Sequence, residues 1–168
     1  PIRSSAASDV YKRQVLSQRF ETKLTKKPID IYKKLRITNP SPFMFFFNFT
    51  DFQIIGASPE ILVRLRDGEI TVRPIAGTRP RGKTIKKDRF YEKDLLKDKK
   101  ELSEHLMLLD LGRNDAGKVS KTNSIKVTES FIIERYSHVM HIVSNVIGKH
   151  DKRFSKFKSL LAGFPAGT

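Results

Sequence analysis

Two glutamates and one histidine in this sequence could act as ligands or as acids and bases, judged by their side chains and their positions. Glu101 and Glu104 lie three residues apart in a segment with helical periodicity, so one rigid element can present both carboxylates to one ligand. The same spacing is common on solvated helix faces, and the pair alone does not establish a site. His141 lies among valines and isoleucines, where a histidine is more often a core residue than an acid or base; its titration near neutral pH keeps both interpretations open.

The helix that must hold the two glutamates is expected over about 88–111. Lys and Asp side chains occupy its outside, while Leu102, Leu106 and Leu109 are expected to hold the face opposite the glutamates in a core. This pattern predicts an amphipathic helix that places two oxygen ligands at the edge of a packed surface.

Apolar strands are expected on both sides of this helix in the sequence. The segment 43–49 is almost wholly aromatic and apolar, which is typical of a strand buried on both faces. Asp67-Gly68 is a two-residue hairpin signal, so we expect the early strands to form an antiparallel meander. The later strand should place His141 and His138 on opposite faces. The expected strands are 43–49, 52–56, 60–66, 69–75, 124–133 and 136–148.

The segment Gly77-Thr78-Arg79-Pro80-Arg81-Gly82 is expected to be a loop because of its Gly and Pro content. It has two interpretations. One is an ordinary turn. In the other, bare glycine amides, a threonine hydroxyl and two arginines supply several hydrogen-bond donors to an anionic substrate.

Composition limits the function classes. The 168 residues carry a net charge of +15 with a pI near 10.1, which raises the alternative of a basic nucleic-acid-binding module. The lysines are scattered, however, and the densest run, 83–100, is interleaved with acids as on a solvated helix. There is no cysteine, which excludes disulfides and thiolate metal sites. There is no apolar run of membrane-spanning length and no signal-peptide pattern, so we expect a cytoplasmic protein without a membrane partner. Residues 1–13 are polar and are expected to be disordered or unrelated to the rest.

Several motifs in order resemble those of the chorismate-utilising enzymes. They are PIAGTRPRG at 74–82, the run at 100–115, ERYSHVMHIVS at 134–144 and PAGT at 165–168. The runs at 14–20, 39–45 and 56–60 resemble, more narrowly, component I of anthranilate synthase. The resemblance covers 14–168 and implies a partial chorismate-binding domain. The implied fold is α+β, a layered sandwich of two antiparallel sheets that enclose the site, with helices outside.

The resemblance also implies roles for individual residues. Glu104 would ligate Mg²⁺ directly or through water, and Glu101 would lie beside it and protonate the departing hydroxyl. His141 matches the histidine associated with elimination of pyruvate. Glu60 would lie close to the reacting ring. The remaining implied residues are Gly77, Thr78 and Thr168 in the substrate pocket and Pro42, Phe43 and Met44 as the remnant of a tryptophan effector site.

Ala76 separates close relatives within this resemblance. The aminodeoxychorismate synthases typically carry a nucleophilic lysine there, so alanine favours direct attack by ammonia supplied by a glutaminase subunit. An aminodeoxychorismate synthase without that lysine remains the alternative. Because further metal ligands and a pyruvyl-binding arginine of the family would follow Thr168, we expect an internal fragment with little or no activity of its own.

Overall fold

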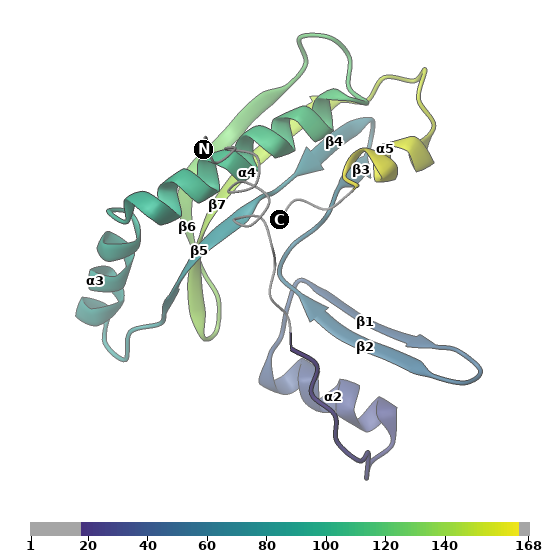
Figure 1. Ribbon diagram of the computed structural model, residues 1–168, viewed down its shortest axis with the longest axis vertical. Coiled ribbons are helices and arrows are strands. Elements are labelled where there is room, and N and C mark those ends of the chain that lie inside the picture. The colour runs from purple at the N-terminus through teal and green to yellow at the C-terminus, as the bar shows by residue number, and fades with distance from the viewer. Residues whose placement is uncertain (1–17, 165–168) are drawn as a thin grey trace, which may run out of the picture.

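The computed structural model describes residues 18–164 as an α+β structure with two antiparallel sheets, which confirms the predicted fold class (Figure 1). The predictions for 1–13 and for Thr168 lie outside the described residues. The helices are α2 (Pro28–Thr38), α3 (Ile85–Leu95), α4 (Lys99–Gly117) and α5 (Lys156–Ala162). The strands are β1 (Phe43–Asn48), β2 (Gln53–Ser58), β3 (Arg64–Arg66), β4 (Glu69–Val72), β5 (Ile75–Pro80), β6 (Lys126–Arg135) and β7 (Val139–Lys149).

The long strand β7 is the centre of the larger sheet. It pairs with β6 along one edge and with both β4 and β5 along the other. Val72 lies opposite Val146 and Ile75 lies opposite Val143, so the register continues unchanged from β4 into β5. These two segments therefore act as one strand interrupted at Arg73 and Pro74, where proline has no N–H to donate to the ladder. The amide of Ser144 still donates to the Pro74 carbonyl (3.2 Å).

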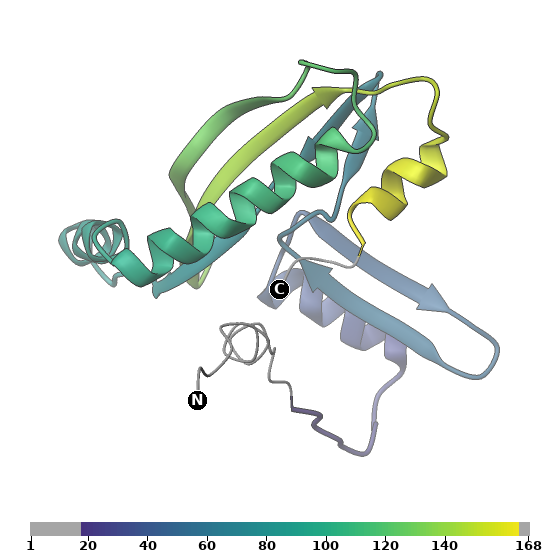
Figure 2. The same ribbon diagram turned by 45° about the horizontal axis from the view of Figure 1, so that its top comes forward.

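Helix α4 covers one face of this sheet (Figure 2). Alternate residues of β7, among them Met140, Ile142 and Val146, are fully buried beneath it, as expected for a strand with one packed face. Leu109 is buried and Leu102 is half-buried, but Leu106 is 50% exposed, so its prediction as a core residue is wrong. The buried row of α4 includes His105 instead.

Two capped helices replace the single helix expected over 88–111. Helix α3 begins at the N-cap Thr84, whose hydroxyl accepts from the Lys87 amide, and it ends at Leu95. Helix α4 begins at the N-cap Asp98, whose carboxylate accepts from the first-turn amides. The glutamate pair consequently lies in the first two turns of α4.

Helix α2 and the β1–β2 hairpin form a separate unit beside the larger sheet (Figures 1 and 2). Because β2 pairs with β1 and not with β3, the predicted continuous meander is wrong at this junction. The prediction that 43–49 is buried on both faces is also wrong: the strand forms, but Phe47 is 52% exposed. The turn at Asp67 and Gly68 is confirmed, and both residues have positive φ as a primed hairpin turn requires. Among the described residues, no helix is long and apolar enough to cross a bilayer.

Candidate active site at the Gly77 bulge

Strand β5 contains a bulge at Gly77. Ala76 pairs with Ile142 and Thr78 pairs with His141, so Gly77 is an extra residue with φ +67°. A regular strand would place Thr78 beneath α4, whereas the bulge turns it to the opposite face of the sheet, beside His141. The prediction of a loop at 77–82 is therefore wrong for its first half, which is a bulged strand. The glycine permits the left-handed conformation.

His141 is held by this bulge. Its Nδ1 lies 3.0 Å from the Gly77 carbonyl and 3.1 Å from the Thr78 hydroxyl. A carbonyl only accepts, so Nδ1 carries the proton in this contact and the neutral ring keeps its lone pair at Nε2. The ring of Tyr136 lies edge-on at 5.5 Å between centroids. His141 is half-buried and anchored at a backbone irregularity, which distinguishes it from an ordinary core histidine.

Glu101 approaches the bulge from α4. A Cβ on Gly77 would lie 3.3 Å from Glu101 Oε2, so this carboxylate is turned toward the glycine backbone. Glu101 is half-buried and Glu104 is exposed. Within residues 18–164, neither glutamate takes part in an ion pair. Gly77 is therefore approached by Glu101 from the α4 face of the sheet and by His141 and Thr78 from the opposite face, with Glu104 one helical turn further along α4.

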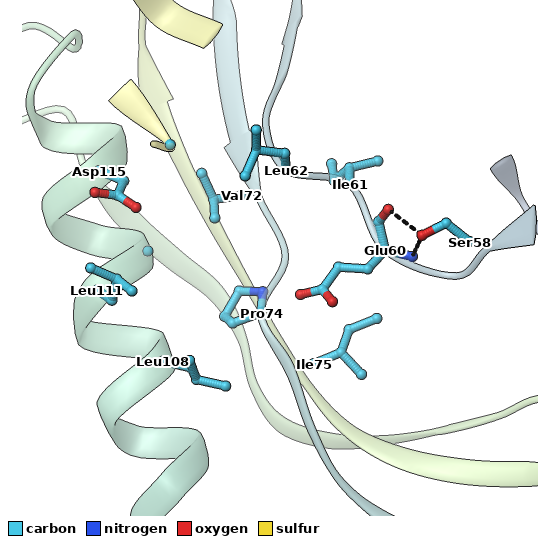
Figure 3. A pocket seen from close by; sticks show the side chains of 12 residues that line it. Ser58, Glu60, Ile61, Leu62, Val72, Pro74, Ile75, Leu108, Leu111 and Asp115 are labelled. Atoms are coloured by element: carbon cyan, nitrogen blue, oxygen red, sulfur yellow. Dashed lines mark hydrogen bonds between the residues drawn. The ribbon is translucent and has the colours of Figure 1, made fainter. Parts of the chain in front are cut away.

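Glu60 lies on the rim of a neighbouring cavity of about 300 Å³ between α4 and the loop after β2 (Figure 3). Glu60 is exposed as a residue, but its carboxylate is turned toward Pro74 and Ile75. Partial burial of the carboxylate raises its pKa, and a hydrogen bond from the Ile75 backbone opposes this shift. Leu108, Leu111 and Asp115 line the facing wall. These three side chains continue the helix face that carries Glu101 and Glu104.

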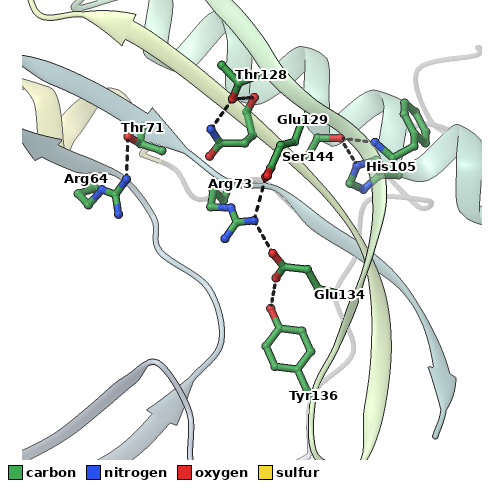
Figure 4. A network of polar contacts seen from close by, with 11 residues as sticks. Arg64, Thr71, Arg73, His105, Thr128, Glu129, Glu134, Tyr136 and Ser144 are labelled. Carbon is green, nitrogen blue, oxygen red and sulfur yellow. Dashed lines mark hydrogen bonds and ion pairs between the residues drawn. The ribbon is translucent and has the colours of Figure 1, made fainter.

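A polar network covers the sheet near His141 (Figure 4). Arg73 donates to Glu129 and Glu134, and Glu134 accepts from the Tyr136 hydroxyl at 2.8 Å. Burial, followed by the hydrogen bond to Glu134, raises the pKa of Tyr136 to about 12, so the phenol stays protonated at neutral pH. Because Glu134 lies directly across from His141 in the ladder, the network fixes the surroundings of the imidazole. Sequence reasoning did not identify this network.

A second histidine is fully buried beneath α4. His105 Nε2 lies 2.7 Å from the hydroxyl of Ser144, which also accepts from the Phe131 amide (Figure 4). Phe131 has φ +54° and its ring meets His105 edge-on. Burial lowers the pKa of His105, which favours the neutral ring. This contact fastens the helix that carries the glutamates to the strand that carries His141.

Residues Pro42, Phe43 and Met44 lie elsewhere, at the start of the β1–β2 hairpin. Phe43 is 42% exposed and pairs with Ser58. The structure does not bring these three residues to the Gly77 bulge.

Comparison with known proteins assigns this arrangement to a family. The family model described as chorismate binding enzyme matches residues 2–168. The chain belongs to the chorismate-binding enzyme family. The resemblance seen in the sequence is thereby confirmed.

Relatives within the chorismate-binding enzymes carry a consistent name. The chain is 63% identical over 162 residues to "Anthranilate synthase component 1" of Cereibacter sphaeroides, and the match covers 96% of this chain and 32% of that protein. Identity to the protein of the same name from Pseudomonas putida is 57%, over 92% of this chain and 31% of the relative. The chain thus spans about a third of the length of these relatives.

Solved structures of chorismate-binding enzymes agree with the fold. Anthranilate synthase component I from Streptococcus pneumoniae TIGR4 superposes with a TM-score of 0.78 at 44% identity, covering 86% of this chain and 31% of that one. A putative 2,3-dihydroxybenzoate-specific isochorismate synthase from Bacillus anthracis superposes with a TM-score of 0.70 over 80% of this chain and 37% of that one. At 24% identity this second likeness concerns the fold alone.

Proposed function

We propose that the protein containing this chain is a lyase that converts chorismate and ammonia to anthranilate and pyruvate, as component I of an anthranilate synthase in tryptophan biosynthesis. A glutaminase subunit would supply the ammonia. The observation that carries the proposal is the convergence of Thr78, His141 and Glu101 on the Gly77 bulge. The 63% identity to a protein named anthranilate synthase component 1 supports the same reaction.

Ala76 favours this reaction over 4-amino chemistry. It lies one residue before the bulge, opposite Ile142, and offers no amine that could attack the ring. Ammonia would therefore act as the nucleophile directly. The alternative, an aminodeoxychorismate synthase that lacks the lysine, is separated by identifying the product as 2-amino or 4-amino.

Mg²⁺ suits the two glutamates. Among residues 18–164 no cluster of three or more acidic or histidine ligands occurs, so this part supplies two carboxylates at most to one ion. Magnesium typically takes one or two carboxylates and completes its shell with water and substrate oxygens. When bound, it would offset the repulsion between these glutamates and the carboxylates of chorismate. Glu104 would hold it directly or through water, and Glu101 would lie beside it and help to hold the ion's water.

The chain's own residues then have distinct tasks. Glu101, half-buried beside Gly77, would give a proton to the ring hydroxyl as that hydroxyl leaves with its bonding electrons and ammonia adds to the ring. His141 would exchange a proton at Nε2 during the later loss of pyruvate, since its Nδ1 is engaged by the bulge. The absence of a side chain on Gly77 would let substrate approach the β5 backbone closely.

The metal role is tested with Glu104→Ala in the full-length protein. Asp110→Ala is a matched control, because Asp110 is an exposed carboxylate on the same helix and its ion pair with Arg113 lies within that helix. We expect Glu104→Ala to abolish Mg²⁺-dependent anthranilate fluorescence and Asp110→Ala to retain it. Unchanged turnover and unchanged magnesium dependence in Glu104→Ala would refute the ligand assignment.

A second assay uses the 168-residue chain alone with chorismate, Mg²⁺ and ammonia. We propose that it shows little or no turnover, because the remaining ligands and the pyruvyl clamp expected from the family would lie in other parts of the longer protein. Robust turnover would contradict this.

The nucleic-acid alternative has less support. Arg73, Arg79, Arg81 and Arg135 are each paired with carboxylates of the same chain, which makes these four guanidinium groups less available to phosphates. A steep salt dependence of binding to random duplex DNA would revive it.

A further inference from the structure

Arg79 follows Thr78 directly and joins β5 to two helices. Its Nε donates to Asp94 in the last turn of α3 at 2.6 Å, and its Nη2 donates to Asp98 at 2.8 Å. Its Nη1 donates to the carbonyl of Thr78 at 3.0 Å. The Arg79 side chain is only 21% exposed, so these charge-assisted contacts are partly shielded from water.

Asp98 is also the N-cap of α4. Its Oδ1 accepts from the amides of Lys100 at 3.0 Å and Glu101 at 3.3 Å, while its Oδ2 accepts from Arg79. One carboxylate therefore connects the first turn of the glutamate-bearing helix to the residue after the bulge.

Directional contacts are needed at this end of α4. The core beneath the helix is largely apolar, and apolar contacts resist separation from the sheet more than they fix position along it. A planar guanidinium has fixed donor directions and fixes both distance and angle.

We propose that Arg79 is a positioning residue that, through Asp98, sets the first turn of α4 relative to the Gly77–Thr78 bulge. It thereby holds Glu101, and with it the first two turns of α4, beside Gly77. The catalytic consequence rests on the proposed function, whereas the structural tie is independent of it.

Three substitutions in the full-length protein distinguish a positioning role of the Arg79–Asp98 contact from a general contribution to stability. Arg79→Met removes the contact, and Arg79→Lys keeps the positive charge but loses the planar set of guanidinium donors. Asp98→Asn removes the negative charge of Asp98 while keeping a good N-cap. Asp94→Asn is the control, since it removes a partner of the same arginine that lies on α3 and not on α4. Hydrogen exchange of the α4 amides 100–104, the Mg²⁺ activation constant and kcat are the readouts.

We expect Arg79→Met and Asp98→Asn each to weaken magnesium activation or kcat by about 10–100-fold, the usual range for outer-shell partners. The double variant should be little worse than either single variant, because the two substitutions remove the same contact between Arg79 and Asp98. Arg79→Lys should fall between wild type and Arg79→Met, and Asp94→Asn should lose less than about threefold. The amides 100–104 should exchange faster in Arg79→Met, with those of α5 unchanged.

Two results would overturn the proposal. One is unchanged exchange at 100–104 in Asp98→Asn and Arg79→Lys. The other is multiplicative losses in the double variant, which would mean that the two residues act separately. If the wild-type protein forms no anthranilate, the proposed function fails, and the exchange measurements still decide the positioning role.

Discussion

Alanine at Gly77 should destabilise the protein more than alanine at Gly68, although both glycines have left-handed backbones. Their φ values are +67° and +79°. A Cβ at Gly77 would lie 3.0 Å from Leu95 Cδ1, 3.2 Å from Ile142 Cδ1 and 3.3 Å from Glu101 Oε2, whereas a Cβ at Gly68 meets nothing within 4 Å. Comparing Gly77→Ala with Gly68→Ala therefore distinguishes the cost of backbone strain, which both share, from the cost of crowding, which only Gly77→Ala has.

The expected magnitudes follow from these surroundings. An L-residue in the left-handed region costs about 1–2 kcal/mol, offset by about 0.4–1 kcal/mol because alanine restricts the unfolded chain. These terms apply at both positions and cancel in the comparison. Crowding should add about 1–2 kcal/mol at Gly77 alone, near the low end for overpacking because the three contacting atoms end flexible side chains. The additional loss corresponds to about 2–8 °C in Tm for a chain of this size.

Urea unfolding followed by far-ultraviolet circular dichroism measures both variants against wild type. The slope with urea should stay constant, so that a shift in midpoint reports stability. Equal losses for Gly77→Ala and Gly68→Ala would refute the crowding argument. In an active full-length protein, Gly77→Ala should also reduce turnover, because the new methyl displaces the Glu101 carboxylate.

Further predictions concern buried polar groups and pH. Ser144→Ala should cost about 1–3 kcal/mol in urea unfolding because it leaves His105 and a backbone amide without their partner; a loss below about 0.5 kcal/mol would contradict this. Since burial lowers the pKa of His105, the unfolded chain binds a proton at this histidine at a higher pH than the folded protein does, and stability should fall as the pH drops below the ordinary histidine pKa of about 6.5. His105→Gln should remove this dependence of stability on pH. Hydrogen bonds from Arg81 lower the pKa of Asp88 to about 2, so its contribution is present above its ordinary pKa and is lost as the pH falls toward 2; Asp88→Asn should flatten the acid limb of a pH titration of stability. Because the pKa of Glu60 is raised, its ionisation opposes folding, and Glu60→Gln should stabilise the protein at pH 7 but not at pH 3; equal effects at both pH values would refute this.

Local signals in the sequence predicted much of the fold. Asp67-Gly68 predicted its hairpin turn because the residues that form it are adjacent. The start of α4 also had a usable signal that the sequence interpretation missed. Asp98 stands three residues before Glu101, the spacing of a helix N-cap followed by an acidic residue. That pattern would have separated α3 from α4.

Long-range pairing explains what could not be predicted. The segment 75–80 has two residues that disfavour strands, Gly77 and Pro80, and it becomes a strand only because β7 pairs with it. Likewise, the exposure of Phe47 depends on which surfaces meet the hairpin, and a local apolar pattern does not specify those surfaces.

The candidate site was found in part from the sequence. The spacing of Glu101 and Glu104 and the family motifs marked the main residues. The tie from Arg79 to Asp98 and the contact between His105 and Ser144 join segments far apart in the sequence, and no local pattern indicates them.

The central position of β7 has a consequence for the order of folding. The contacts that hold His141 at the bulge join residues 63 and 64 positions apart, and β7 is also the partner of β4 and β6. During synthesis, β4 can pair with β3 in the local hairpin, whereas β5 must wait for β7 before it gains its partner in the sheet. Closing such loops costs entropy before any pairing compensates it, which slows folding. Site assembly should coincide with completion of the sheet, so a nascent chain that ends before β7 should have neither.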